Sequence, residues 1–111
     1  MDNLKLAAAA ADDKKARDLT ALDISAIASF ASWFLICTGD SSRQIQAIAD
    51  EIEARLKKAG VRPDHIEGYQ NAEWVVMDYS GLIVHIFSRT ARAYYDLERL
   101  WRDAVPVDLQ L

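Results

Sequence analysis

The chain has 111 residues, of which 51% are hydrophobic and 27% charged, which predicts one globular domain with one modest core. No segment approaches the roughly 20 consecutive apolar residues of a membrane span. The net charge of -4 gives no general attraction for nucleic acid and favours a basic protein surface as partner. The lone Cys37 cannot form an internal disulfide, and Asp12 and Asp13 interrupt the early alanines. We therefore expect a cytoplasmic protein without a signal or transit peptide.

The first half of the chain predicts two helices and two strands. The alanine-rich residues 4–19 favour a helix that lies on the domain without being central to it, because its apolar side is mainly alanine. Residues 20–25 alternate as a strand does, and the uniformly apolar residues 33–37 predict a strand buried on both faces. Ser41 and the glutamine three residues later match a capping box, which begins the best-defined helix, and Gly60 ends it.

The second half predicts three strands and a last helix. Residues 65–68 suggest a short strand, and residues 73–78 and 82–88 form a strong hairpin pattern around a two-residue turn. Thr90 can cap a helix over residues 91–102. Its apolar side contains Tyr94, Leu97, Leu100 and Trp101.

This order of elements predicts an α/β fold. We expect a single-domain sandwich in which a mixed β-sheet is flanked by helices. Residues 1–18 are expected to form an N-terminal helical segment, residues 19–102 the α/β domain, and residues 103–111 a C-terminal tail.

The register of the hairpin predicts what each face of the sheet carries. If Tyr79 pairs with Leu82 across the turn, one face is apolar apart from the Tyr79 phenol and belongs to the core. The opposite face then contains Trp74, Val76, Asp78, Ile83, His85 and Phe87. Large aromatic groups mixed with a carboxylate and an imidazole are typical of a binding surface. The alternative is that a helix covers this face and that Asp78 and His85 bond to each other or to the backbone.

Groups for catalysis or metal binding are largely missing. Cys37 lies in an apolar strand, which predicts an inert thiol, and two histidines with one cysteine cannot form a structural zinc cluster. The Gly39–Ser42 turn precedes a helix as phosphate-binding loops do, although a capping turn explains it better. A nucleotide-binding or nucleotidyltransferase-like enzyme that uses this turn and Asp78 is the alternative function, but one carboxylate is a weak magnesium site. We therefore predict a non-enzymatic protein without metal or cofactor.

Several motifs resemble the Iojap-like ribosomal silencing factor family in order and spacing, from about residue 19 to residue 101. The most specific is Tyr95-Asp96-Leu97-Glu98-Arg99-Leu100-Trp101. The others are residues 21–25, 34–39, 41–44, 61–63, 67–68, 73–78 and 84–87. Three positions depart from the family pattern: Ser32-Trp33 replaces the more usual Asp-Tyr, and Asp40 replaces a small or hydroxylated residue.

The resemblance implies a fold related to nucleotidyltransferases without their catalytic acids. It also implies binding to the large ribosomal subunit through its ribosomal protein fourteen, which sterically blocks subunit joining and represses translation. A homodimer when free of the ribosome is a further implication, and neither DNA nor a membrane is an expected partner. The implied contact residues are Trp74, Asp78, His85 and Tyr95. Phe87 joins them from the register of the hairpin.

Overall fold

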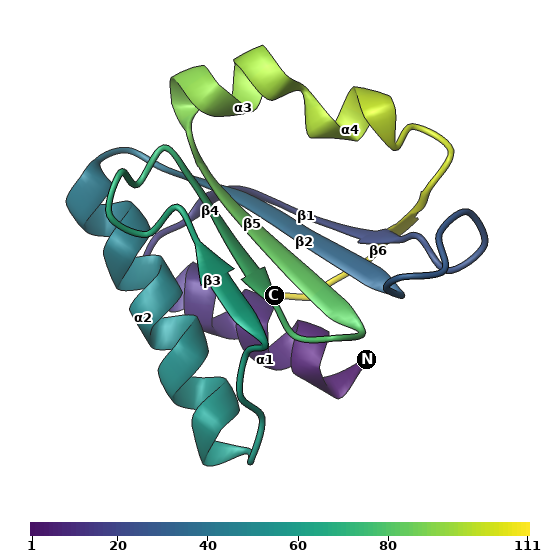
Figure 1. Cartoon of the computed structure of the whole chain (residues 1–111), viewed down its shortest axis with the longest axis horizontal. Helices are drawn as coiled ribbons and strands as arrows, with labels where there is room; N and C mark the ends of the chain where they lie inside the picture. Colours follow the sequence, from purple (N-terminus) through teal and green to yellow (C-terminus); the bar gives the residue numbers. More distant parts are fainter.

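A computed structural model of the whole chain, residues 1–111, shows a six-stranded sheet in the order β3-β4-β5-β2-β1-β6, with helices on both faces (Figure 1). The elements are α1 (Asp2–Asp13), β1 (Arg17–Asp23), β2 (Trp33–Gly39), α2 (Ser42–Lys58), β3 (His65–Glu67), β4 (Trp74–Asp78), β5 (Leu82–Ser88), α3 (Arg89–Tyr95), α4 (Leu97–Leu100) and β6 (Val105–Val107). Strands β2 and β5 are parallel, and all other neighbours are antiparallel. The predicted α/β sandwich with a mixed sheet is confirmed.

The sheet separates two apolar cores, and its central strand β2 contributes side chains to both. All of its residues after Trp33 are buried, as its uniformly apolar sequence predicts. The larger core lies between the sheet and the helices α1 and α2, and the smaller core lies under α3 and α4 (Figure 1). None of the helices combines the length and the hydropathy that crossing a bilayer requires.

The capping box at the start of α2 is present with one change. Ser41 Oγ accepts a hydrogen bond from the backbone N–H of Gln44, at 3.1 Å. The Gln44 carboxamide oxygen accepts from the backbone N–H of Asp40 instead of that of Ser41. Its amide nitrogen donates to the carbonyls of Lys14 and Lys15, so this one side chain joins the end of α1 to the start of α2.

Helix α1 is more central than its sequence predicts. Its buried side has no exposed surface at all, and the residues on it are Leu4, Ala7, Ala8, Ala10 and Ala11. All of them belong to the larger core together with the apolar face of α2. Alanine adds little apolar area, but its small side chain allows helices to approach closely. The N-terminal segment therefore packs as part of the α/β domain.

The two ends of the domain also differ from expectation. The first strand begins at Arg17, within the segment expected to be helical, and continues to Asp23. The expected C-terminal tail contributes the edge strand β6, which pairs antiparallel with β1. Proline is tolerated at position 106 because an edge strand needs backbone donors on one side only. The segments expected before residue 19 and after residue 102 thus belong to the same sheet and core as the rest of the chain.

The single helix expected over residues 91–102 is interrupted. Helix α3 begins at Arg89, because Ser88 Oγ accepts a hydrogen bond from the Ala91 N–H and takes the capping role expected of Thr90. It ends at Tyr95, because the next residue, Asp96, has a left-handed φ of 47°, and α4 follows at Leu97. The change of direction splits the expected apolar side. Leu97 is buried, whereas Tyr94 is 80% exposed and Leu100 is 76% exposed.

Replacing Leu4 with alanine should lower the free energy of unfolding by about 2–4 kcal/mol, because a fully buried leucine would leave a cavity in the larger core. Urea denaturation followed by circular dichroism measures this change. Leu6→Ala is the matched control, since Leu6 lies on the exposed side of the same helix and should change stability by less than about 0.5 kcal/mol. Equal effects of the two substitutions would contradict the central position of α1.

Candidate functional site

The hairpin has the register that the sequence predicts. The backbone N–H of Tyr79 donates to the carbonyl of Leu82 at 2.8 Å, across the turn. Trp74 pairs with Phe87, Val76 with His85, and Asp78 with Ile83. The opposite face lies in the larger core, and its residues are Val75, Met77, Tyr79, Leu82, Val84 and Ile86. The division of the hairpin into a core face and a mixed face is therefore confirmed.

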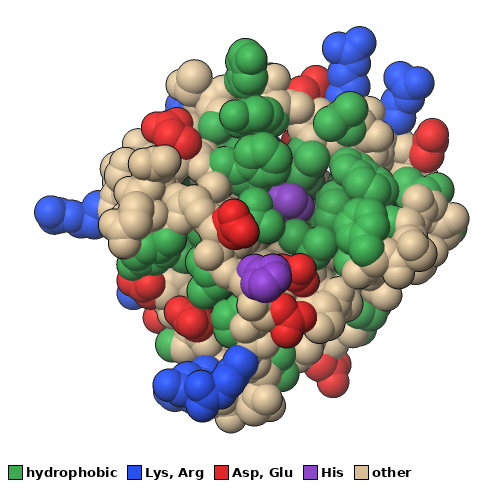
Figure 2. Space-filling view, in the orientation of Figure 1, with side chains coloured by type: hydrophobic (Ala, Val, Ile, Leu, Met, Phe, Trp, Pro, Cys, Tyr) green, Lys and Arg blue, Asp and Glu red, His purple; other side chains and the backbone are tan.

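The mixed face is partly covered and partly open. Phe87 has no exposed surface and lies in the smaller core, and His85 is only 6% exposed. Trp74 and Asp78 are half-buried, and Tyr95 of α3 is exposed. Hydrophobic side chains gather on this side of the molecule (Figure 2). The sequence left open whether this face is an exposed binding surface or is covered by a helix. In the structure, α3 and α4 cover part of it and leave the β3–β4 side open.

Trp74 is the centre of an aromatic cluster at this open edge. Its indole Nε1–H donates to Nδ1 of His85 at 3.1 Å. Its ring stacks on Phe87 with a centroid separation of 5.1 Å and lies 4.6 Å from the ring of Tyr95. Phe87, expected as a contact residue, is instead the buried floor under Trp74. Four of the five expected site residues thus come together, with Trp74 and Tyr95 accessible and His85 and Phe87 beneath them.

Asp78 stands apart from this cluster. Its Oδ1 accepts a hydrogen bond from the backbone N–H of Ser80, at 3.0 Å, which stabilises the hairpin turn. Ser80 has a φ of 69°, so a bond that holds the turn offsets some backbone strain. Asp78 and His85 do not bond to each other. The carboxylate lies at the turn end of the hairpin, whereas Trp74 lies at the other end.

Contacts between aromatic rings extend further than the sequence indicated, partly through buried residues. The Phe34 ring lies 4.7 Å from His85, Trp101 lies 5.0 Å from Phe34, and Phe30 lies 5.8 Å from Trp101. We call the chain of rings formed by Phe30, Trp101, Phe34, His85, Trp74 and Tyr95 the aromatic strip. The participation of Phe30 was missed because it lies in a loop without a periodic pattern. Trp101, expected on the apolar side of the last helix, follows α4 and packs against Phe34 of β2.

His85 is a neutral imidazole in this setting. Burial lowers its pKa to about 4, because the charged form would lose its hydration. Since Nδ1 accepts from Trp74, the proton of the neutral ring is assigned to Nε2. That Nε2 is buried without a hydrogen-bond partner within the chain. His85 therefore orients Trp74 without adding charge to the surface.

The groups of the alternative enzyme site are too far apart to act together. Gly39 pairs with Ser88 at one end of β5, and Asp78 pairs with Ile83 near the other end. Five residues of strand separate these positions, about 17 Å at 3.3 Å per residue. Cys37 is buried, and burial raises the pKa of its thiol to about 12, which agrees with the predicted inert thiol. No three side chains of His, Cys, Asp or Glu are grouped to hold a metal ion.

Gly68 lies close against the backbone of Trp74. Its φ of +79° is left-handed, and a Cβ atom there would overlap the carbonyl oxygen of Trp74. Gly68→Ala should lower the free energy of unfolding by about 2 kcal/mol or more, as judged by urea denaturation. Gly81→Ala is the matched control, because a Cβ at position 81 would meet open space. Similar stability of the two variants would show that the loop before β4 adapts without cost.

The fold and the aromatic strip define a small α/β protein of the binding class. The family model described as ribosomal silencing factor during starvation matches residues 1–111. A ribosomal silencing factor from Bacillus subtilis is 47% identical over 106 residues, which covers 96% of this chain and 90% of the relative. The chain therefore belongs to the ribosomal silencing factor family. The predicted family membership is confirmed, and the chain is a non-enzymatic factor, as members of this family are.

Solved structures and a plant relative support the same assignment. A crystal structure of a protein from Chromobacterium violaceum superposes with a TM-score of 0.88 at 39% identity, covering 90% of this chain and 83% of that chain. A crystal structure of a protein from Bacillus halodurans superposes with a TM-score of 0.84 at 42% identity, and the match covers 95% of each chain. The chloroplastic protein Iojap of Zea mays is 30% identical over 92% of this chain and 44% of its own length.

Proposed function

We propose that this chain represses translation by binding the large ribosomal subunit through its ribosomal protein fourteen and sterically blocking the small subunit. The observation that carries the proposal is the accessible pair of Trp74 and Tyr95 on the open side of the sheet. Family membership supports the ribosome as the partner, because the relatives are named as ribosomal silencing factors. Steric blocking needs an exposed binding surface and no turnover.

The aromatic pair has the properties of a binding hot spot. The bond to His85 and the stack on Phe87 hold Trp74 in place before any partner arrives. A preorganised side chain loses little conformational entropy on binding, so more of the contact energy contributes to affinity. Tryptophan and tyrosine are also the residue types that dominate such hot spots.

The charge around this surface favours a basic partner. The chain carries a formal net charge of -4, and acidic side chains border the hydrophobic patch (Figure 2). The acidic residues of the β3–β4 side are Asp64, Glu67, Glu73 and Asp78. Such a rim accelerates association with a positively charged surface and loses its effect at high salt.

The proposal is tested by measuring subunit joining with purified components. Light scattering should show that preincubation of the large subunit with the chain suppresses joining, with saturation near one chain per subunit. Calorimetry with isolated ribosomal protein fourteen should show a one-to-one complex. Suppression far below equimolar amounts would indicate turnover and contradict steric blocking, and a flat calorimetric titration would exclude the proposed partner.

We also infer that the free chain forms a homodimer that covers the aromatic strip. Large exposed apolar side chains lie along this side, including Phe30, Tyr94 and Leu100. The sedimentation coefficient should increase with protein concentration, and a Phe30→Ser/Leu100→Ser variant should remain monomeric. A coefficient independent of concentration would exclude the dimer and leave the ribosomal proposal intact.

A further inference from the structure

A second polar site lies where the two parallel strands end. Strand β2 continues into α2 on one face of the sheet, and its neighbour β5 continues into α3 on the opposite face (Figure 1). Adjacent parallel strands whose connections leave to opposite faces form a crevice outside their carboxyl ends. In open α/β sheets, this crevice is the usual place for a ligand.

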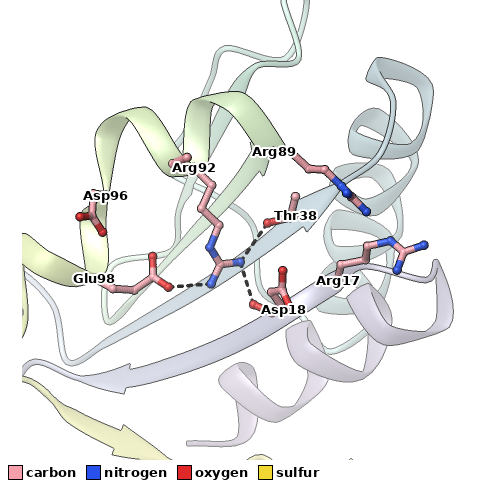
Figure 3. A pocket seen from close by; sticks show the side chains of 8 residues that line it. Arg17, Asp18, Thr38, Arg89, Arg92, Asp96 and Glu98 are labelled. Carbon is pink, nitrogen blue, oxygen red and sulfur yellow. Dashed lines mark hydrogen bonds and ion pairs between the residues drawn. The ribbon is translucent and has the colours of Figure 1, made fainter.

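A cavity of about 700 Å³ occupies this position. We call it the switch-point crevice. Its charged side chains are Arg17, Arg89, Arg92, Asp18, Asp96 and Glu98, and Figure 3 shows how they surround the end of β2. The aromatic strip does not contribute to its lining, so the crevice is distinct from the surface described above.

Arg92 has a structural role in the crevice. Its guanidinium donates to the carbonyl of Asp18 at 2.7 Å, to Thr38 Oγ1 at 3.0 Å and to Glu98 at 2.8 Å, and a further bond reaches Thr20 (Figure 3). With these acceptors in place, its hydrogen-bonding capacity is largely used. Arg92 therefore ties α3 and α4 to the sheet and forms the fixed wall of the crevice.

Arg17 and Arg89 are arranged differently. Each donates its Nε–H to one oxygen of Asp40, at 2.7 Å and 3.1 Å. The two side chains extend to the same side of the crevice, and they are 57% and 68% exposed (Figure 3). Their terminal Nη groups have no hydrogen bonds to the chain. One carboxylate thus holds two guanidinium groups side by side, with a net charge of +1 and free donors directed outward.

We propose that Arg17 and Arg89 bind a phosphate group, which RNA of the large ribosomal subunit presents to the crevice. Paired guanidinium forks are well suited to phosphate oxygens. The α2 N-terminus follows Asp40 directly, and its dipole favours an anion at this end of the crevice. The identity of the RNA as the source rests on the proposed ribosomal function.

Two features favour RNA over a free nucleotide as the source of the phosphate. The crevice also contains Asp18, Asp96 and Glu98, so its overall charge is low and a free anion binds it only weakly. If the partner is already held at a nearby contact, the effective concentration of its phosphate at the crevice is high. The crevice then needs much less affinity of its own for that phosphate. Such a contact is available, because α3 carries Arg89 toward the crevice and Tyr95 toward Trp74.

The phosphate site is tested first on the isolated protein. Because a free anion binds weakly, inorganic phosphate is added at high concentration. It should shift the amide resonances of residues 39–43 and of the first turn of α3, and R17Q/R89Q should abolish these shifts. The matched control K57Q/K58Q removes the same charge from the exposed C-terminal end of α2 and should retain them. The site is excluded if phosphate leaves these resonances unchanged, or if both double variants respond alike. This measurement is independent of whether the chain binds ribosomes.

The source of the phosphate is tested on purified large subunits at several salt concentrations. R17Q/R89Q should weaken binding several-fold at low salt. The slope of log affinity against log salt should also become shallower, by about 1 for each phosphate that the variant no longer binds. K57Q/K58Q should leave the slope unchanged. Trp74→Ala should weaken binding but also leave the slope unchanged. An unchanged slope in R17Q/R89Q would exclude RNA as the source. Absence of wild-type binding would reject the ribosomal function, while the resonance shifts would still report on the phosphate site.

Discussion

Replacing Trp74 with alanine should reduce affinity for the large ribosomal subunit by about 30-fold or more, which corresponds to about 2 kcal/mol. The indole lies in the proposed contact surface, where it contacts His85, Phe87 and Tyr95. Removing it takes away the anchor and also leaves Nδ1 of His85 without its donor. Sedimentation of the purified chain with large subunits, over a range of subunit concentrations, measures the loss.

Two controls separate this effect from unfolding. Trp74→Phe keeps an aromatic ring against Phe87 and Tyr95 but cannot donate to His85, so its affinity should lie between those of the wild type and the alanine variant. Circular dichroism and urea denaturation should show that both variants fold, since Trp74 is half-buried at the edge of the smaller core. Unchanged affinity in a folded Trp74→Ala variant would show that the partner binds elsewhere.

Lowering the pH from 7 to about 4 should remove up to about 3 kcal/mol of folding stability through His85 alone. Burial lowers its pKa from 6.5 to about 4 in the folded chain, whereas the unfolded chain takes up a proton near the ordinary value. The stability is therefore complete above pH 6.5 and is lost progressively as the pH falls toward 4. Urea denaturation at intervals over this range gives the free energy of unfolding.

A non-titrating variant isolates the contribution of His85 from that of the carboxylates. In His85→Asn, the side-chain oxygen can still accept from the Trp74 indole, but no proton is taken up in this range. The free energy of unfolding of this variant should depend on pH less steeply than that of the wild type, with the difference confined to pH 4–6.5. Parallel curves would show that water reaches His85 and that its pKa is near the ordinary value.

The hairpin was predictable because its geometry is local. A two-residue turn fixes which residues face each other, and strict alternation then assigns each side chain to a face. The same reasoning placed Tyr79 in the core and Trp74 on the opposite face, as the structure has them. Local patterns also gave the cap at Ser41, where the polar partners lie within a few residues.

The features that the sequence did not predict depend on contacts between distant parts of the chain. The burial of α1 needs a partner helix that fits its small side chains, and alanine content alone does not reveal one. The break at Asp96 is stabilised by the pairing of Arg92 with Glu98 and by Leu97 entering the smaller core, neither of which is a capping signal. Phe87 is buried because Ala91 of α3 and Leu97 of α4 lie with it in the smaller core.

The pairing of β6 with β1 has a consequence for the synthesis of the chain. Residues 105–107 pair with residues 21–23, so one side of β1 gains its neighbour only when the chain has been made as far as residue 107. Loop closure over such a sequence distance is slow compared with helix formation, and domains generally fold as units during synthesis. Residues 105–107 must therefore emerge from the ribosome before the sheet is finished. A chain proposed to silence ribosomes thus completes its sheet only after its last strand has left the ribosome that makes it.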